Sequence, residues 1–289
     1  MKNKKVTIVV IILLIILILV LLGGMIHMLG KNHRIRRYNE NLVIDQTYTN
    51  KYANIEVESD AGDIEIKETD EENIRVIIYG ENDRSDVRDI GNTLKITIKA
   101  KKCFGICFNI EMSKVVVYLP KNYKGTIDLS NKYGDIDVGS FKEAKVLIKE
   151  DCGDVKVESA LTLDAENSYG DITIGEVETA TVKQSCGNVK IDYLKRGNIK
   201  NKLGDVKIKK VDGEISIEED CGDIVIDELY LTDNSDIKNS FGDIKLGQTN
   251  EIYIDAQVSL GDIKIDENYR KSSITLKLKN DCGDIKVSN

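Results

Sequence analysis

A short glycine–aspartate motif recurs along the chain and constrains its fold more than any other feature. The motif is Gly-Asp-Ile or Gly-Asp-Val, and Gly-Asn-Val in one copy. Its copies begin at Gly62, Gly134, Gly153, Gly170, Gly187, Gly204, Gly222, Gly242, Gly261 and Gly283. From Gly134 onward, successive copies lie 17 to 22 residues apart. A period this regular is typical of stacked structural repeats, because one such unit cannot bury its apolar face alone.

Apolar residues alternate with polar ones on both sides of each motif. Ile172 and Ile174 follow one copy, and Ile215 and Ile217 precede another. Alternation with a period of two, rich in β-branched residues, indicates half-buried strands. Each unit of about 18 residues is therefore expected to contain a strand, a tight turn, a second strand and a second turn. This predicts an all-β, single-domain β-solenoid in which the motif glycines occupy structural turns.

The first forty residues have a different composition and divide into three parts. Residues 1–5 form a short basic N-terminus, 6–29 a predicted transmembrane helix, and 30–40 a basic juxtamembrane linker. In the span 6–22 only Thr7 is polar, and about twenty apolar residues cross a bilayer. The apolar run is longer than a signal-peptide core and no small-residue cleavage site follows, so we expect an uncleaved anchor in the lipid bilayer. Basic residues flank both sides, so charge leaves the orientation open.

The remaining chain is expected to form one elongated body. Residues 41–130 contain one motif copy and irregular strands at 73–79, 94–98 and 115–119, and we predict that they form an atypical N-terminal cap. Residues 131–289 carry the regular repeat. Seven of the 41 Lys and Arg residues lie within the first 37 positions, which leaves 34 basic against 49 acidic residues, a net charge of −15. A body this acidic repels phosphate backbones, so we expect no nucleic-acid partner.

The motif aspartates are the most regular set of ionisable residues. They are Asp135, Asp154, Asp171, Asp205, Asp223, Asp243, Asp262 and Asp284, with Asn188 at the equivalent place in one copy. Stacked rungs would repeat these carboxylates about every 4.8 Å, a spacing that could attract calcium. The G-G-x-G-x-D pattern of calcium-binding repeats is absent, however, so we interpret the aspartates as caps of the turns. We expect no metal and no cofactor.

Six cysteines fall into two groups. Cys103 and Cys107 are close enough to form a local disulfide. Cys152, Cys186, Cys221 and Cys282 each precede a motif glycine, mostly in alternate copies, where bulky residues precede the other copies. Two rungs lie about 9.6 Å apart, beyond the reach of a disulfide. We predict that these four are buried thiols outside any disulfide, which would suit a reducing compartment.

No pattern of catalytic residues is present in the repeats. Both histidines, His27 and His33, lie in or beside the predicted membrane segment, and no P-loop, HExxH or Rossmann glycine pattern occurs. Acids are abundant, so a polysaccharide-acting enzyme that uses repeat carboxylates is an alternative. No acid departs from the repeat in a way that marks a pocket. We therefore expect a protein that is not an enzyme.

Three segments carry a resemblance to a known family: Ala53–Ile66 (ANIEVESDAGDIEI), Val115–Val138 (VVVYLPKNYKGTIDLSNKYGDIDV) and the later units with Cys, Tyr, Leu or Phe before Gly-Asp. They resemble the "putative adhesin", or Toastrack, family (domain of unknown function 4097), over about residues 41–289. The resemblance implies a β-solenoid with an envelope-associated role and transfers no catalytic residue. The chain departs from the family by placing Cys or an aromatic residue where many relatives have Ser.

The last predicted strand, Ile285, Lys286 and Val287, has no capping element after it. An open strand edge can pair with another chain, so we expect this end to dock an envelope protein or a second copy. The predicted function is a membrane-anchored, non-enzymatic binding, adhesion or stress-sensing module with its solenoid outside the cytoplasm. The alternative is a cytoplasmic-facing scaffold that assembles end to end through the solenoid edges.

Overall fold

The computed structural model describes residues 41–81, 84–100 and 112–288. These residues form twenty strands of one continuous sheet and no α-helix. The chain is an all-β solenoid, as predicted. The predicted transmembrane helix at 6–29 lies outside the described residues, and among those described no helix is long and apolar enough to cross a membrane.

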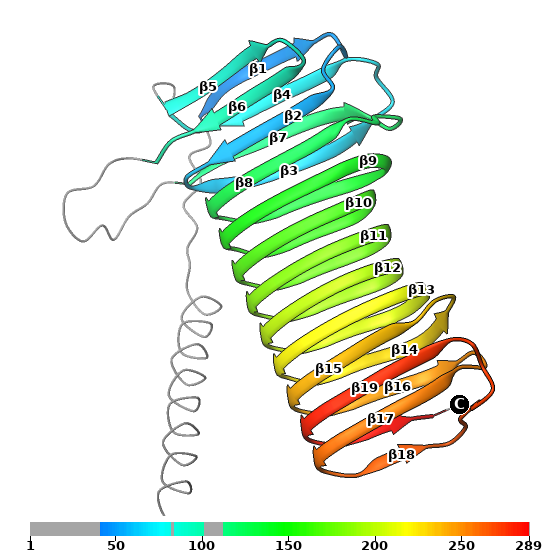
Figure 1. Ribbon diagram of the computed structural model, residues 1–289. Coiled ribbons are helices and arrows are strands. Elements are labelled where there is room, and N and C mark those ends of the chain that lie inside the picture. Colours follow the sequence, from blue (N-terminus) through cyan, green and yellow to red (C-terminus); the bar gives the residue numbers. More distant parts are fainter. Residues whose placement is uncertain (1–40, 82–83, 101–111, 289) are drawn as a thin grey trace, which may run out of the picture. The chain divides into compact units, whose positions relative to one another are not determined.

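Five long strands make the regular middle of the stack (Figure 1). They are β9 (Ile136–Cys152), β10 (Val155–Tyr169), β11 (Ile172–Cys186), β12 (Val189–Leu203) and β13 (Val206–Cys221). Each pairs in parallel with the next. Each is a whole rung, so the second turn expected from the sequence is a bend within one continuous strand. The strand keeps its hydrogen bonds through the bend because the neighbouring rung bends at the same place.

The core lies between the two halves of every rung. In β11 the inward residues are Ile172, Ile174, Val177, Ala180 and Val182, and none is more than 1% exposed. Equivalent side chains of all the other rungs join them in one apolar cluster that runs from Tyr52 to Val287. Burying a Val, Leu or Ile side chain contributes about 1.5–3 kcal/mol. The rungs are therefore stable only as a stack, because each exposes this face when alone.

The motif glycines meet at one corner of the stack, where each rung turns. Gly170 has a φ of +132°, a value that residues with a Cβ rarely adopt. A Cβ placed there would also collide with the carbonyl oxygen of Gly153 on the neighbouring rung, and the same collision recurs along the file. Glycine is thus required at this corner both by its backbone dihedrals and by the close approach of the next rung.

At the C-terminal end, the order of rungs in space departs from the order in the sequence. The strands are β14 (Ile224–Leu231), β15 (Ser235–Phe241), β16 (Ile244–Thr249), β17 (Tyr253–Leu260), β18 (Ile263–Ile265), β19 (Thr275–Cys282) and β20 (Ile285–Val287). β19 lies between β15 and β17, and β20 lies between β16 and β18. The last segment of the chain is thus inserted beneath the segment that precedes it.

This insertion corrects the expectation that Ile285, Lys286 and Val287 present an open edge. β20 is paired on both sides, and Ile285 and Val287 are buried. The physical reason is that β20 gains a ladder on each side by lying inside the stack. The rung at the end is formed by β17 and β18 instead.

The N-terminal region continues the same core. Its strands are β1 (Leu42–Tyr48), β2 (Asn54–Ser59), β3 (Gly62–Thr69), β4 (Ile74–Tyr79), β5 (Ser85–Ile90), β6 (Thr93–Ile98), β7 (Ser113–Pro120) and β8 (Thr126–Tyr133). β2 and β3 form a rung that pairs in parallel with β8 and β9 on one side and with β6 and β7 on the other. The outer strands β1, β4 and β5 pair antiparallel. Together with β2, β3, β6, β7 and β8 they form the N-terminal end of the stack, the cap.

The corner glycines predict a strong and position-specific effect of mutation. We expect Gly170→Ala to lower the free energy of unfolding by about 3 kcal/mol or more, because it adds both a strained dihedral and a backbone collision. Gly91→Asn is the matched control, since Gly91 has a φ of +63° but nothing within 4 Å of its would-be Cβ. We expect that control to change stability by less than about 1 kcal/mol. Denaturant unfolding followed by circular dichroism measures both, and equal effects would contradict the stacking argument.

Candidate functional site

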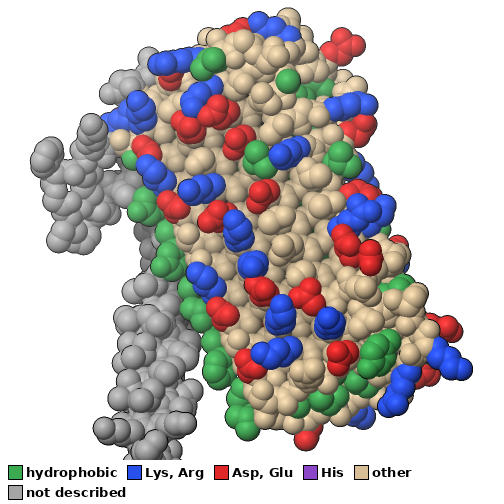
Figure 2. All heavy atoms as spheres, viewed as in Figure 1, with side chains coloured by type: hydrophobic (Ala, Val, Ile, Leu, Met, Phe, Trp, Pro, Cys, Tyr) green, Lys and Arg blue, Asp and Glu red, His purple; other side chains and the backbone are tan. Residues whose placement is uncertain are grey.

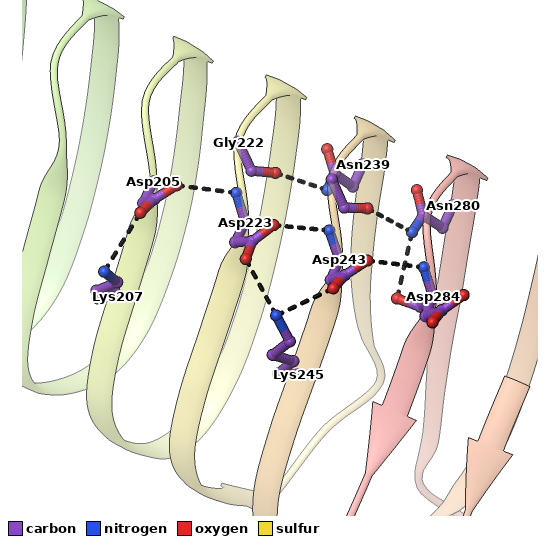
Figure 3. A network of polar contacts seen from close by, with 10 residues as sticks. Asp205, Lys207, Gly222, Asp223, Asn239, Asp243, Lys245, Asn280 and Asp284 are labelled. Atoms are coloured by element: carbon purple, nitrogen blue, oxygen red, sulfur yellow. Dashed lines mark hydrogen bonds and ion pairs between the residues drawn. The ribbon is translucent and has the colours of Figure 1, made fainter. Parts of the chain in front are cut away.

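The motif aspartates form one hydrogen-bonded file down the corner (Figure 3). On each rung the Oδ1 atom of the aspartate accepts a hydrogen bond from the backbone N–H of the equivalent residue on the next rung, at 2.8–3.1 Å. The order of the file is Asp63, Asp135, Asp154, Asp171, Asn188, Asp205, Asp223, Asp243, Asp284 and Asp262. Asn188 keeps the bond through its own Oδ1. The side chains therefore cap the turns between rungs.

Lysines neutralise part of this file from the adjoining face. Lys245 Nζ lies 3.1 Å from Asp223 Oδ2 and 3.0 Å from Asp243 Oδ2. The N–H of Asp284 and the Lys245 ammonium together lower the pKa of the Asp243 carboxyl. Across the described ranges, no group of three or more His, Cys, Asp or Glu is arranged to hold a metal ion. Asp223 and Asp243 are thus bound both by backbone N–H groups and by Lys245.

The capping geometry predicts a difference between two substitutions at Asp171. Asp171→Ala leaves the N–H of Asn188 without its acceptor and should lower the free energy of unfolding by about 1 kcal/mol. Asp171→Asn keeps an acceptor oxygen and should be nearly neutral. Thermal melts of both variants and the wild type, each with EDTA and with excess calcium, measure this. A wild-type melting temperature raised by calcium, with the rise lost in Asp171→Asn, would instead support the calcium ladder.

The residue before each motif glycine from Gly134 onward belongs to a second file, which we call the corner ridge. From the cap toward the other end its members are Tyr133, Cys152, Tyr169, Cys186, Leu203, Cys221, Phe241, Cys282 and Leu260. Bulky residues and cysteines alternate without exception in this spatial order. The sequence order shows only a near alternation, because Leu260 precedes Cys282 in the chain. The inserted C-terminal rung restores the pattern.

Four of the five bulky members of the ridge are strongly exposed, and Leu203 is half-buried. Tyr133, Tyr169, Phe241 and Leu260 are 48%, 50%, 43% and 70% exposed, respectively. Hydrophobic side chains follow one edge of the stack in Figure 2. Nine rungs at the usual strand spacing give this apolar strip a length of about 38 Å. A strip of this length is unusual on a soluble surface and marks a candidate contact site.

The four ridge cysteines lie between bulky neighbours and none forms a disulfide. They are half-buried, whereas the sequence analysis predicted buried thiols; the corner leaves one side of each open. Burial raises the pKa of the Cys186 and Cys221 thiols. No two lie on adjacent rungs, which keeps them apart. Cys103 and Cys107, whose spacing would allow a local disulfide, lie outside the described residues.

A third file, buried behind the corner, was missed by the sequence analysis. It occupies the third position before eight of the ten motif glycines: Asn131, Glu150, Asn167, Gln184, Asn201, Glu219, Asn239 and Asn280, all at most 3% exposed. The amide nitrogens of this file donate to the carbonyl oxygens of corner glycines, as Asn167 does to Gly153 at 3.0 Å. The sequence contains a signal for this file, because a polar residue recurs at a position where the alternation of the strand requires an apolar one.

Two members of this buried file are acids. Glu150 and Glu219 each accept a backbone N–H, from Cys152 at 3.1 Å and from Cys221 at 3.2 Å. Their Oε2 atoms are buried and have no hydrogen-bond partner among the described residues. Burial raises the pKa of both carboxyls to about 8. Both are therefore mainly protonated at neutral pH, where the acid O–H can take the donor role that amides play on other rungs.

These acids predict a stability that depends on pH. The unfolded pKa is 4.5 and the folded pKa is about 8, so their protonation favours the folded state in acid, and this contribution is lost as pH rises from about 4.5 to about 8. The change is about 5 kcal/mol per glutamate. We expect Glu150→Gln with Glu219→Gln to flatten the profile, since Gln184 already fits the file. Urea unfolding at several pH values measures it, and an unchanged slope in the double variant would refute the assignment.

One cavity is formed at the end rung. It has a volume of about 470 Å³ and is lined by β17, β18 and the loop after them. Asp255 is the one carboxylate among its lining residues, which also include Arg270 and Asn268. The two acids with strongly raised pKa values lie in the core and not in this cavity. A pair of carboxylates suited to glycoside chemistry is therefore not formed there.

The stacked Gly-Asp turns and the amino-acid sequence both match one protein family. The family model described as Toastrack DUF4097 matches residues 52–289. The chain belongs to the Toastrack family. This confirms the resemblance given by the Gly-Asp units and their solenoid fold.

Solved structures that are similar to this chain are distant from it in sequence. A "putative lipid binding protein" from Parabacteroides distasonis is 16% identical with a TM-score of 0.51, and the match covers 86% of this chain and 98% of that one. A "putative adhesin" from Bacteroides fragilis is 18% identical over 87% of this chain and 99% of that one, with a TM-score of 0.48. Among curated proteins, none is significantly similar in sequence. At these identities the first likeness supports the fold alone.

Proposed function

We propose that this Toastrack protein is a membrane-anchored, non-enzymatic binding module of the cell envelope, and that the corner ridge is its contact surface. The observation that carries the proposal is the exposure of Tyr133, Tyr169, Phe241 and Leu260 in one straight file. Leaving such side chains in water is unfavourable, and aromatic residues in exposed apolar patches are the usual anchors of protein interfaces.

The ridge geometry indicates the shape of the partner. Bulky side chains recur on every second rung, about 9.6 Å apart, and each gap between them holds a cysteine. A rigid periodic strip of this kind suits an extended apolar or amphipathic chain that runs along the stack. The carboxylate file beside the ridge would repel an anionic surface, which makes an acidic lipid headgroup a poor partner.

Membrane attachment is the second part of the proposal. The apolar span 6–29 supplies the anchor, and the basic segment 30–40 would lie at the lipid headgroups. Adhesion and stress sensing both require a tethered binding surface. We propose that the solenoid lies outside the cytoplasm, and a cytoplasmic-facing scaffold is the alternative.

Photocrosslinking in intact cells tests the contact surface. The full chain carries p-benzoylphenylalanine in place of Tyr169 or Phe241, and in place of Leu161 as the control. Leu161 is 44% exposed on β10 but lies off the ridge, so it matches the ridge positions in exposure. We expect a discrete adduct from both ridge positions and none from Leu161. Adducts of equal yield from all three positions, or from none, would reject the ridge as the contact surface.

The same cells test the compartment. External protease should remove the solenoid from intact cells if it lies outside the cytoplasm, and should leave it intact until lysis in the alternative arrangement. Extraction with carbonate, compared with a chain lacking residues 1–29, tests the anchor. The fold does not depend on that deletion, because the core cluster begins at Tyr52.

A further inference from the structure

The rung formed by β17 and β18, which we call the end rung, is paired on one side only within the described residues. β17 pairs with β19, and β18 pairs with β20. Figure 1 shows these two strands at the end of the stack opposite the cap. Ile263 is 42% exposed, whereas Ile285 and Ile244, at the same register on the next two rungs, are fully buried. The end rung therefore exposes both an unpaired strand edge and part of the core.

Only the first part of the β17 edge is covered. The side chain of Asn268 accepts the N–H of Ile254 at 3.0 Å and donates to its carbonyl oxygen at 2.9 Å. The backbone groups of Ile254 therefore point away from β19. Because these groups alternate along a strand, those of Ala256 and Val258 point outward as well. An uncovered edge of this kind readily adds another strand.

Charge at the end rung is sparse and of both signs. β17 carries one charged residue, Asp255, and β18 carries one, Lys264. Arg270 lies with Asp255 around the cavity of about 470 Å³, and neither is in an ion pair with another described residue. The surface thus offers acid and base for pairing and lacks the repeated charges that protect exposed strand edges.

The cap end is built differently. Its outer strand β5 carries Asp86, Arg88 and Asp89 in six residues. On β1, Asp45 is held by Arg75 of β4 through two hydrogen bonds of 2.7 and 2.8 Å. These charges oppose the addition of a strand, and the outer strands there are antiparallel. Stacking of the end rung onto the cap of another copy is therefore unfavourable.

We propose that the end rung is the interface for a second copy of this chain, joined end rung to end rung about a twofold axis. An axis that sets β17 of one copy against β18 of the other makes the paired strands antiparallel, so they can form a regular ladder. The axis also brings the acid of one copy, Asp255, to an edge that carries Lys264 and Arg270 of the other. The contact covers Ile263 in both copies and places the two caps at opposite ends of a doubled stack.

Light scattering on the full chain in a mild detergent tests this proposal over a range of concentrations. The wild type is expected to have the protein mass of two copies. Val258→Pro removes an outward N–H without breaking a bond to β19, and Ile263→Lys places a charge inside the apolar part of the contact. Each variant should weaken association at least tenfold. Leu161→Lys is the matched control, because Leu161 is 44% exposed but lies on β10, and it should leave association unchanged.

Hydrogen exchange supplies a second readout that does not depend on mass. The amides of Ala256 and Val258 should exchange slowly in the wild type and rapidly in Ile263→Lys, while amides of β11 stay equally protected in both, which shows that the variant is folded. A wild type of one copy at every concentration would overturn the proposal. So would equal loss of association in Leu161→Lys, or equal exchange of the β17 amides in the wild type and Ile263→Lys.

Replacement of Tyr169 by Ser, on the corner ridge, should leave association unchanged, which separates this interface from the proposed binding surface.

Discussion

The close approach of consecutive corner glycines is the constraint on which the rest of the structure depends. The carbonyl oxygen of one corner glycine occupies the space that a side chain of the next would need, as Gly153 does for Gly170. This contact fixes where one rung lies on the next, so each residue stacks on its equivalent. The register from Val155–Ile172 to Tyr169–Cys186 holds without a shift over the whole rung. A slip by one residue would turn every core side chain toward solvent.

In-register stacking converts each position of the repeat into a straight file of like residues. The aspartate file caps backbone N–H groups, the buried amide file satisfies the corner carbonyls, and the apolar files form the core. Like residues in a file lie about 4.8 Å apart, so neighbouring carboxylates repel one another unless they are paired or protonated. The motif aspartates use backbone donors and lysines, whereas Glu150 and Glu219 remain protonated because burial disfavours their charged forms. The corner ridge is the file whose bulky side chains the fold leaves most exposed, as Tyr169 and Leu260 show, and this exposure connects the architecture to the proposed binding role.

The two ends of the solenoid differ in how their outermost strand edges are covered. At the cap, β2 is paired on both sides, with β6 and with β8. The antiparallel strands β1, β4 and β5 cover the outermost rung there. At the other end, β19 and β20 are inserted beneath β17 and β18, which remain paired on one side. Charged residues on β5 protect the first edge, while the strands of the second carry only Asp255 and Lys264. The stack thus has one end whose strand edges are protected and one end whose strand edge is suited to association.

The sequence by itself determined the solenoid, the corner glycines and aspartates, and the strands of the cap at 73–79, 94–98 and 115–119. These follow from patterns that are local: alternation marks a strand, and Gly-Asp marks a turn. The tertiary structure alone decided the order of the last rungs, the strict alternation of the corner ridge and the identity of the open edge. The segments around Gly261 and Gly283 have nearly the same pattern, so either could lie against Gly242. The choice between them depends on strand pairing and core packing over long range, which local periodicity does not encode.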